Sequence, residues 1–241
     1  HNELQYITEI SLKSPATMIP QAKNELKRMA DMAQENLDRS IKGFLNQSDE
    51  YLNKIYHREE DINNVSHAIT DYLVKSNQLS LPLADQKILG SMFYVVNDIE
   101  RIGDHAENFA DYTKTELKHN TGLTGDAKEE IKKMYEAVSK LLKLSLESFM
   151  AQDGVNTQED KLAEIAALEA SIDKMERRYQ KHHIKRLAKG DCEPRAGLLF
   201  SDMLSELERI ADHSVNIAYS MSDEDEDEML AAENEALATN N

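Results

Sequence analysis

Two copies of one acidic pattern contain the residues in this sequence best placed to do chemistry. Glu100 and Asp104 are four residues apart, and so are Glu208 and Asp212. On a helix this spacing puts both carboxylates of a pair on the same face, about 5 to 6 Å apart, where they repel each other. Paired acids suit oxygen coordination of a cation, because each carboxylate can fill one or two ligand positions. Both pairs are therefore candidate metal ligands.

A second polar stripe in each half is a candidate for the facing side of such a site. In the second half a helix would present Glu169, Asp173, Glu176 and Gln180 on one face. The corresponding stripe in the first half is Glu59, Asn63, Ser66 and Thr70. Because Asn63 places an amide where the second half has a carboxylate, we expect the first site to be the weaker one.

A solvated helix face is the alternative to a metal site, since Arg101 and Arg209 directly follow the glutamates. An ordinary solvated helix surface, however, pairs Glu with Lys at this spacing. The acidic pattern also occurs twice, inside E-R-I-x-D-H-x-x-N, and this repetition favours metal binding. His105 and His213 lie about 140° around the helix from the glutamates, so we expect them outside the ligand set.

The acidic patterns belong to an internal repeat, which is the first feature to establish in a chain of this kind. Three matches occur in the same order in both halves: 22–29 with 127–134, 59–63 with 169–173, and 98–105 with 206–213. Phe44 and Phe149 extend the first match at the same offset. The chain is therefore predicted to contain two copies of one unit.

Each copy is predicted to contain three helices. Long stretches rich in Leu, Ile, Ala, Met, Glu and Lys are interrupted by only four prolines and eight glycines, which favours helix over strand. Pro82 and Pro194 each open a helix, where the missing N–H costs nothing. The predicted helices span residues 15–47, 50–78, 82–118, 124–151, 157–189 and 194–221. The fold class is therefore all-α: two tandem antiparallel three-helix bundles in an elongated rod about 45 Å long.

The predicted domain organisation has four parts. They are a lead-in segment at 1–19, the first bundle at 20–120, the second bundle at 121–221 and an acidic tail at 222–241. Asp223 through Glu228 are six consecutive acids that repel one another, which predicts a disordered tail.

Composition and charge exclude several classes of function. The formal net charge of −17 argues against direct binding of nucleic acid, because phosphate contacts require clustered Lys and Arg. Cys192 is the only cysteine, so no internal disulfide can form and a cytoplasmic location is expected. No run reaches the roughly 20 apolar residues needed to span a bilayer. We therefore expect no membrane insertion of this part of the chain.

Residues 98–108 and 205–216 resemble the repeated motif of the PhoU family of phosphate-uptake regulators, and the likeness covers about residues 20–221. The resemblance implies two three-helix bundles whose E/D-x-x-x-D motifs bind multinuclear clusters of iron or zinc. Asn63 departs from the family pattern. Carried over position by position, the resemblance implies the metal ligands Glu59, Glu100, Asp104, Glu169, Asp173, Glu208 and Asp212.

Residues 14–29 are similar to the junction that follows the membrane part of bacterial sodium/phosphate cotransporters, whose cytoplasmic C-terminus is a PhoU-like domain. This resemblance implies a regulatory domain at the inner face of the cell membrane, with a membrane part preceding His1. A free-standing PhoU-type regulator is the alternative. The expected partners are the transporter part of the same polypeptide or a phosphate-transport or signalling complex, and the long faces of the rod also allow a homodimer.

Three functional hypotheses follow. The first is a metal-binding regulatory module without turnover. The second is a metal-free helical scaffold that docks basic partners on its acidic faces. The third is a carboxylate-bridged metalloenzyme, which is least favoured because no Gly-rich phosphate loop, Cys pair or nucleophile accompanies the acids. The Glu-x-x-His spacing of di-iron proteins is also absent, because Gly103 and Ala211 occupy the third position. We therefore expect no enzymatic activity.

Overall fold

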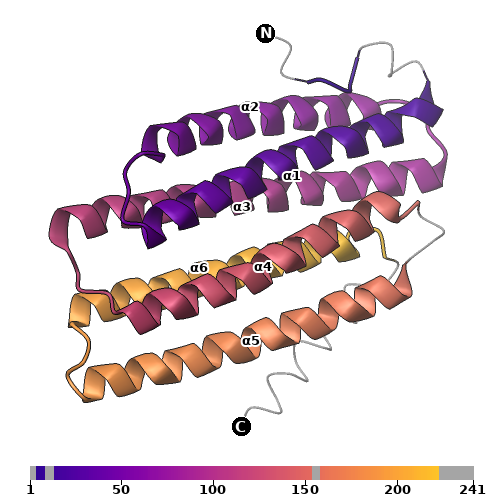
Figure 1. Cartoon of the computed structure of the whole chain (residues 1–241). Helices are drawn as coiled ribbons and strands as arrows, with labels where there is room; N and C mark the ends of the chain where they lie inside the picture. Colours follow the sequence, from indigo (N-terminus) through magenta and orange to yellow (C-terminus); the bar gives the residue numbers. More distant parts are fainter. Residues whose placement is uncertain (1–3, 9–13, 154–157, 223–241) are drawn as a thin grey trace.

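The computed structural model describes residues 4–8, 14–153 and 158–222, and all regular structure in these ranges is helical. Figure 1 shows three helices of the first repeat above three of the second. The prediction of an all-α chain built from two three-helix units is confirmed. In chain order the helices are α1 (Pro15–Leu45), α2 (Leu52–Asn77), α3 (Leu83–His119), α4 (Gly125–Ala151), α5 (Glu159–Ala188) and α6 (Pro194–Tyr219).

The ends of the helices follow the proline and turn signals of the sequence. Helix α1 begins at Pro15, inside the segment that was predicted as a lead-in, and α6 begins at Pro194. Pro82 precedes the first residue of α3. The predicted acidic tail lies outside the described residues, apart from Ser222. None of the described helices is both long enough and apolar enough to cross a membrane.

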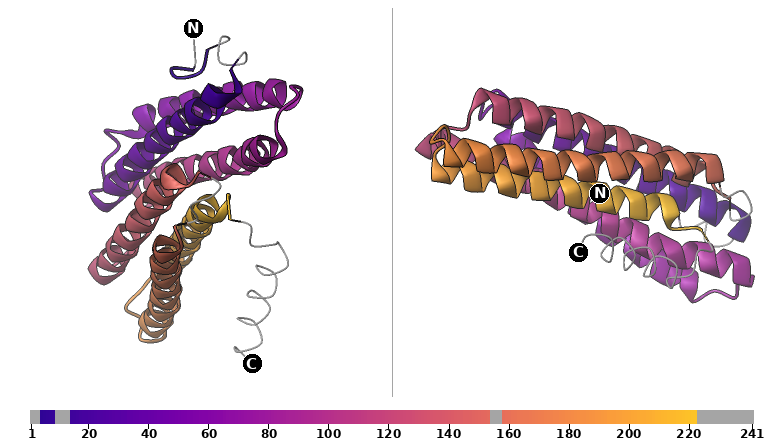
Figure 2. Two further views of the ribbon diagram at one scale, coloured as in Figure 1. Left: turned by 90° about the vertical axis from the view of Figure 1, so that its right-hand side faces the viewer. Right: turned by 90° about the horizontal axis from the view of Figure 1, so that it is seen from below.

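Apolar side chains from all six helices form a core that runs through both units. In the first unit α3 packs against α1 and α2, and in the second unit α6 packs against α4 and α5. The units meet where α3 packs on α6 and α1 on α4, so they lie side by side (Figure 2). Phe44 and Phe149, which occupy matching positions of the repeat, are both fully buried. Burial of each such side chain contributes about 1.5 to 3 kcal/mol.

A buried acid on α6 anchors the contact between the two units. Glu206 accepts hydrogen bonds from His105 Nδ1, from Asn108 Nδ2 at 3.1 Å and from the Tyr112 hydroxyl at 3.3 Å. Burial by itself raises the pKa of Glu206, but these hydrogen bonds outweigh it, so that the pKa lies below its ordinary value. The carboxylate of Glu206 is therefore a buried, hydrogen-bonded anion that stabilises the contact between the units.

The reciprocal contact is made by the matching residues of the other unit. Asp98 on α3 accepts a hydrogen bond from His213 Nδ1 at 2.9 Å and lies 3.5 Å from Asn216 Nδ2. The rings of His105 and His213 lie between these contacts, with centroids 5.9 Å apart. The repeat thus forms a self-complementary interface of the kind found at a twofold axis.

Lys23 connects the units at a second place. Its side chain is 8% exposed and donates from Nζ to the carbonyl oxygens of Phe149, at 3.2 Å, and Gln152. Burial lowers the pKa of Lys23, and the nearby charge of Asp153 opposes that change. A cation is favourable here because the last carbonyl groups of α4 carry the negative end of the helix dipole.

We expect Glu206→Ala to destabilise the protein by about 3 kcal/mol, because it leaves His105, Asn108 and Tyr112 without their shared acceptor. Equilibrium unfolding in urea measures this change. Asp202→Ala is the matched control, since Asp202 lies one turn earlier on α6 and is exposed. A loss at Glu206 no greater than the loss at Asp202 would contradict the structural role assigned to this contact.

Candidate metal centre

Four carboxylates from two helices gather in the first unit. Glu59 on α2 is 3% exposed and lies near three acids of α3, which are Glu100, Asp104 and Glu107. Burial and the charges of Asp104, Glu107 and Glu100 raise the pKa of Glu59 to about 8. The predicted ligands Glu59, Glu100 and Asp104 are therefore brought into one cluster.

Glu59 is held in an unusual position for an acid. No donor group reaches either of its carboxylate oxygens, both fully buried, and the side-chain interaction that Glu59 makes is with the carboxyl group of Asp104. The carboxylate packs over Gly103 on α3, where a Cβ atom would lie only 2.9 Å from Glu59 Oε2. The missing side chain at Gly103 thus makes room for an acid that must bind either a proton or a cation to offset its burial.

Polar neighbours complete the first cluster. Ser66 Oγ donates to Glu100 Oε2 at 3.2 Å, while Asp104 lies 3.7 Å from the largely exposed Arg101. The side-chain oxygen of Asn63 is buried and has no hydrogen-bond partner. Compared with Asp173 at the matching position of the second unit, the amide of Asn63 carries no negative charge but still offers an oxygen that could bind a metal ion.

The second unit holds the matching cluster between α5 and α6. Burial and the charges of Asp173 and Asp212 raise the pKa of Glu169 to about 7. Burial and the charge of Asp173 also raise the pKa of Glu208, against a lowering effect of Arg209. The four predicted ligands of this half therefore lie near one another. Glu169 is less buried than Glu59.

Two further acids join the clusters and were not among the predicted ligands. The pKa of Glu107 on α3 is raised by burial and by the charges of Asp111 and Asp104. The pKa of Glu176 on α5 is raised by burial and by the charge of Glu208. Glu107 lies seven residues after Glu100, which is the same helix face, so its spacing could have identified it. Glu176 belongs to the stripe that was noted in the sequence.

Asn108 belongs to the interface between the units and not to the acidic cluster. It is the last residue of the pattern E-R-I-x-D-H-x-x-N, on the same side of the helix as Glu100 and Asp104, where it could have added a ligand or oriented the acids. In the structure it donates to Glu206 across the interface between the units. His105 and His213 likewise bind Glu206 and Asp98 through Nδ1. The polar residues of α3 thus form two groups: those on the side facing α2 belong to the acidic cluster, and those on the side facing α6 belong to the interface between the units.

The donor atoms available in the clusters fit a metal ion in chemistry. They are carboxylate and amide oxygens, and no donor group reaches the two buried oxygens of Glu59. Oxygen donors suit hard cations, whereas zinc sites more often use Cys or His. Within the described residues, however, no three His, Cys, Asp or Glu side chains are already arranged to hold one ion. The carboxylates would therefore need side-chain movement to close around it.

Comparison with known proteins places the whole repeat in one family. The model of the PhoU domain matches residues 26–113 and 131–221, which are the two halves of the repeat. The accessory protein PhoU homolog 1 of the phosphate-specific transport system of Thermotoga maritima is 20% identical over 196 residues, covering 81% of this chain and 82% of that protein. The corresponding PhoU homolog of Clostridium acetobutylicum is 23% identical over 199 residues, covering 82% and 87%.

Solved structures agree with the fold. The crystal structure of PhoU from Pseudomonas aeruginosa has a TM-score of 0.75 at 20% identity, covering 86% of this chain and 96% of that chain. The phosphate transport system regulatory protein PhoU from Streptococcus pneumoniae also has a TM-score of 0.75, at 21% identity, covering 86% and 95%. The motif E-R-I-x-D-H in both halves predicted this assignment. The chain belongs to the PhoU domain family.

Proposed function

We propose that this chain is a metal-binding regulatory module of phosphate uptake that acts through contacts with other proteins and performs no turnover. Its family membership supports the regulatory role, since the relatives in Thermotoga maritima and Clostridium acetobutylicum are named as accessory proteins of the phosphate-specific transport system. The expected location is the cytoplasm, at the inner face of the cell membrane where a phosphate transporter is embedded.

The buried carboxylate of Glu59 is the observation that supports metal binding most directly. An acid that lies beside other carboxylates, with two buried oxygens that no donor group reaches, is costly as an anion. A bound cation would supply the positive charge that offsets this cost and would tie α2 to α3. Glu59, Glu100 and Asp104 would hold it in the first unit, and Glu169, Asp173, Glu208 and Asp212 in the second.

Two arguments bear on the identity of the metal. The family resemblance implies iron or zinc. The all-oxygen donor set suits hard cations such as manganese or magnesium. Iron on carboxylates satisfies both arguments best, and we propose it as the first ion to test.

Attachment to a transporter is the second part of the proposal. Residues 14–29, which begin α1, resemble the junction after the membrane part of sodium/phosphate cotransporters. A free-standing PhoU-type regulator fits the fold and the family equally well. The length of the complete gene product distinguishes the two, because an attached regulator requires several apolar spans in the same polypeptide.

A metal-free scaffold is the competing function. It is favoured by the absence, within the described ranges, of three ligand-type side chains already arranged around one point. In that case the clustered acids would dock a basic partner directly, and the partner's Lys or Arg side chains would offset the buried charge.

We expect protein purified without chelator to retain bound metal. The variants Glu100→Ala/Asp104→Ala and Glu208→Ala/Asp212→Ala should each lose the metal that is bound at the altered cluster. Elemental analysis measures the loss. The metal-binding function predicts less metal and lower thermal stability, because binding stabilises the folded state by mass action. The scaffold function predicts no metal and a small gain in stability as repulsion is relieved.

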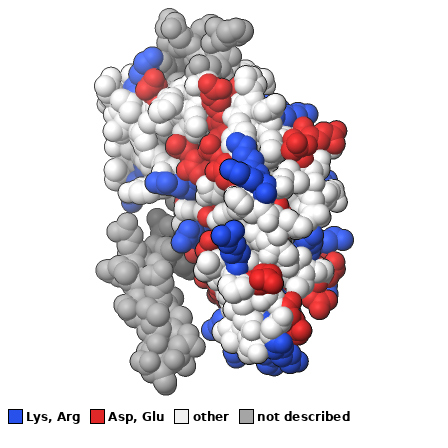
Figure 3. Space-filling view, turned by 90° about the vertical axis from the view of Figure 1, so that its left-hand side faces the viewer, with Lys and Arg blue, Asp and Glu red and all other residues white. Residues whose placement is uncertain are grey.

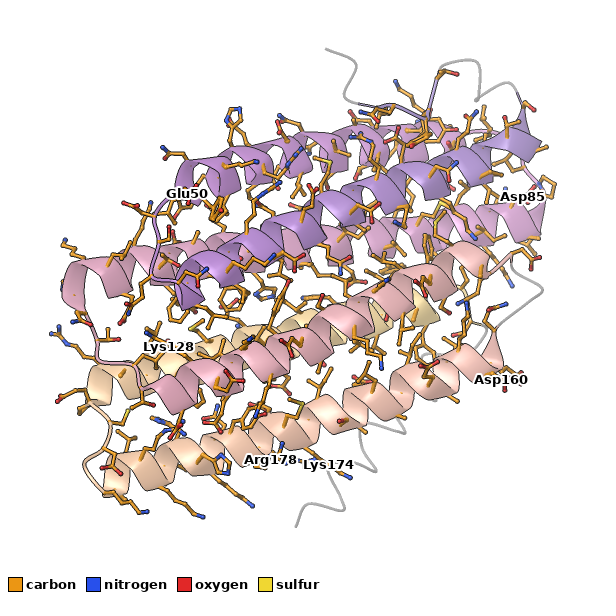
Figure 4. The ribbon with its side chains drawn as sticks, in the orientation of Figure 1. Glu50, Asp85, Lys128, Asp160, Lys174 and Arg178 are labelled. Atoms are coloured by element: carbon orange, nitrogen blue, oxygen red, sulfur yellow. The ribbon has the colours of Figure 1, made fainter. Side chains whose placement is uncertain are left out.

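Asp160→Ala/Glu164→Ala is the matched control for this experiment. These two acids are also one turn apart and exposed on α5, and Asp160 is labelled at the far end of that helix in Figure 4. The control should keep its metal. Metal-free protein that takes up no iron, manganese or zinc from solution would end the metal-binding part of the proposal and leave the scaffold.

The stability of metal-free protein should fall as the pH rises. Glu59 and Glu169 have pKa values of about 8 and about 7 in the folded state, against an ordinary value of 4.5. Between these limits the folded state keeps protons that the unfolded state has lost, so the free energy of unfolding decreases from about pH 4.5 to about pH 8 and then levels off. Urea unfolding at a series of pH values measures this slope.

Glu59→Gln/Glu169→Gln should flatten the pH dependence and raise stability at pH 8, because neither amide carries a charge to bury. Glu60→Gln, at an exposed neighbour of Glu59, should leave the slope unchanged. An equal slope in the wild type and in the double amide variant would show that these two acids are solvated rather than buried.

A further inference from the structure

The second half of α5 carries a concentration of positive charge that the metal clusters do not explain. Residues 174–189 contain seven Lys and Arg but only one acid, in a chain with 28 Lys and Arg against 45 Asp and Glu. Lys and Arg also cover the lower edge of the molecule in Figure 3, where the C-terminal end of α5 lies. This segment is therefore a basic surface on an otherwise acidic protein.

The basic side chains form one row along the outer face of α5. Their spacing of three and four residues places them on a single helix face, opposite the buried Tyr179 and His183. Figure 4 shows Lys174 and Arg178 on the edge of α5 that faces away from the other helices. The row is about 16 Å long at 1.5 Å per residue. Its exposed members are Lys174, Arg177, Arg178, Lys181 and Lys185.

Three lysines of the row have no ion pair among the described residues of the protein, whereas Arg177 lies near Asp173 and Glu176. In the part of the chain that the structure describes, no carboxylate lies within 4 Å of the amino groups of Lys174, Lys181 or Lys185. The negative charge elsewhere on the molecule acts weakly on an outside surface, because salt screens charges over about 8 Å at physiological ionic strength. The row is therefore available to an anionic partner.

Apolar side chains project beside the basic row. Ile184 is 62% exposed and Leu198, on α6, is 69% exposed. Leu187 lies one turn after Ile184 and reaches Gly197, the residue that precedes Leu198. Exposed apolar groups flanked by Lys and Arg on a helix are typical of binding to the headgroup region of a membrane.

A pocket between α4 and α5 lies beside the basic row. It has a volume of about 600 Å³ and opens beside Lys185. Glu130, one of its three acids, is already bound by His182 and Arg186 at 2.6 Å each. Its lining is Asp126, Glu129, Glu130, Lys133, Arg178, Tyr179, His182, Lys185 and Arg186.

We propose that the outer edge of α5, with Ile184, Leu187 and Leu198, docks on the surface of an anionic lipid membrane. The basic row would contact the phosphate groups, and the apolar side chains would enter the headgroup region without spanning the bilayer. A lipid surface fits better than an acidic protein because a flat and continuous partner can reach both the basic row on α5 and the exposed apolar side chains of α5 and α6 that lie beside it. This inference does not depend on metal binding.

Flotation of the full chain with lipid vesicles tests the proposal. We expect binding to phosphatidylcholine vesicles that contain phosphatidylglycerol, no binding to pure phosphatidylcholine, and weakening with added salt. Lys181→Glu/Lys185→Glu should reduce binding at least about tenfold, since each basic residue near an anionic surface contributes a severalfold effect. Ile184→Ser should weaken binding in a way that salt changes little.

Lys140→Glu/Lys143→Glu is the matched control, with the same change in charge at two exposed lysines on α4. It should bind vesicles as the wild type does, and circular dichroism should show that all variants are folded. Failure of the wild type to bind anionic vesicles would overturn the proposal, as would equal losses in the two charge-reversal variants. Binding to polyglutamate but not to vesicles would instead assign the row to an acidic protein partner and also overturn it.

Discussion

The cost of burying carboxylates inside a helical bundle is the constraint on which the rest of this structure depends. The protein meets that cost in two ways. Glu206 and Asp98 receive hydrogen bonds from His, Asn and Tyr side chains of the other unit, so their charge is satisfied and holds the two units together. Glu59 has no such donor, and burial raises its pKa to about 8. The hydrogen-bonded acids Glu206 and Asp98 thus form the interface between the units, whereas Glu59 is left to bind a proton or a cation.

Helix α3 takes part in both arrangements. One side of α3 faces α2 and the acidic cluster, and another side faces α6 and the interface between the units. His105 directly follows Asp104 in the chain and binds Glu206 of the other unit, so the cluster and the interface lie within a single turn of α3. Under the proposed function, an ion bound at the cluster would act on the interface through this short connection.

Charge is distributed unevenly over the molecule, and this separates its proposed tasks. The acids gather between α2 and α3 and between α5 and α6, while α5 turns a row of Lys and Arg outward. Since salt screens interactions beyond about 8 Å, each surface acts through its local charge rather than through the net charge of −17. A negatively charged protein can therefore hold cations on one face and meet an anionic surface with another.

The sequence by itself determined the helices, the repeat, the family and the helix faces that carry acids. Helix periodicity and proline positions suffice for these features, because they are local properties of the chain. Only the tertiary structure decided which faces meet. In the tertiary structure Asn108 binds Glu206 and not the acidic cluster, Glu107 joins the first cluster, and Glu59 packs over Gly103. The reason is that a 3.6-residue period fixes directions around one helix but not which neighbouring helix each direction will face.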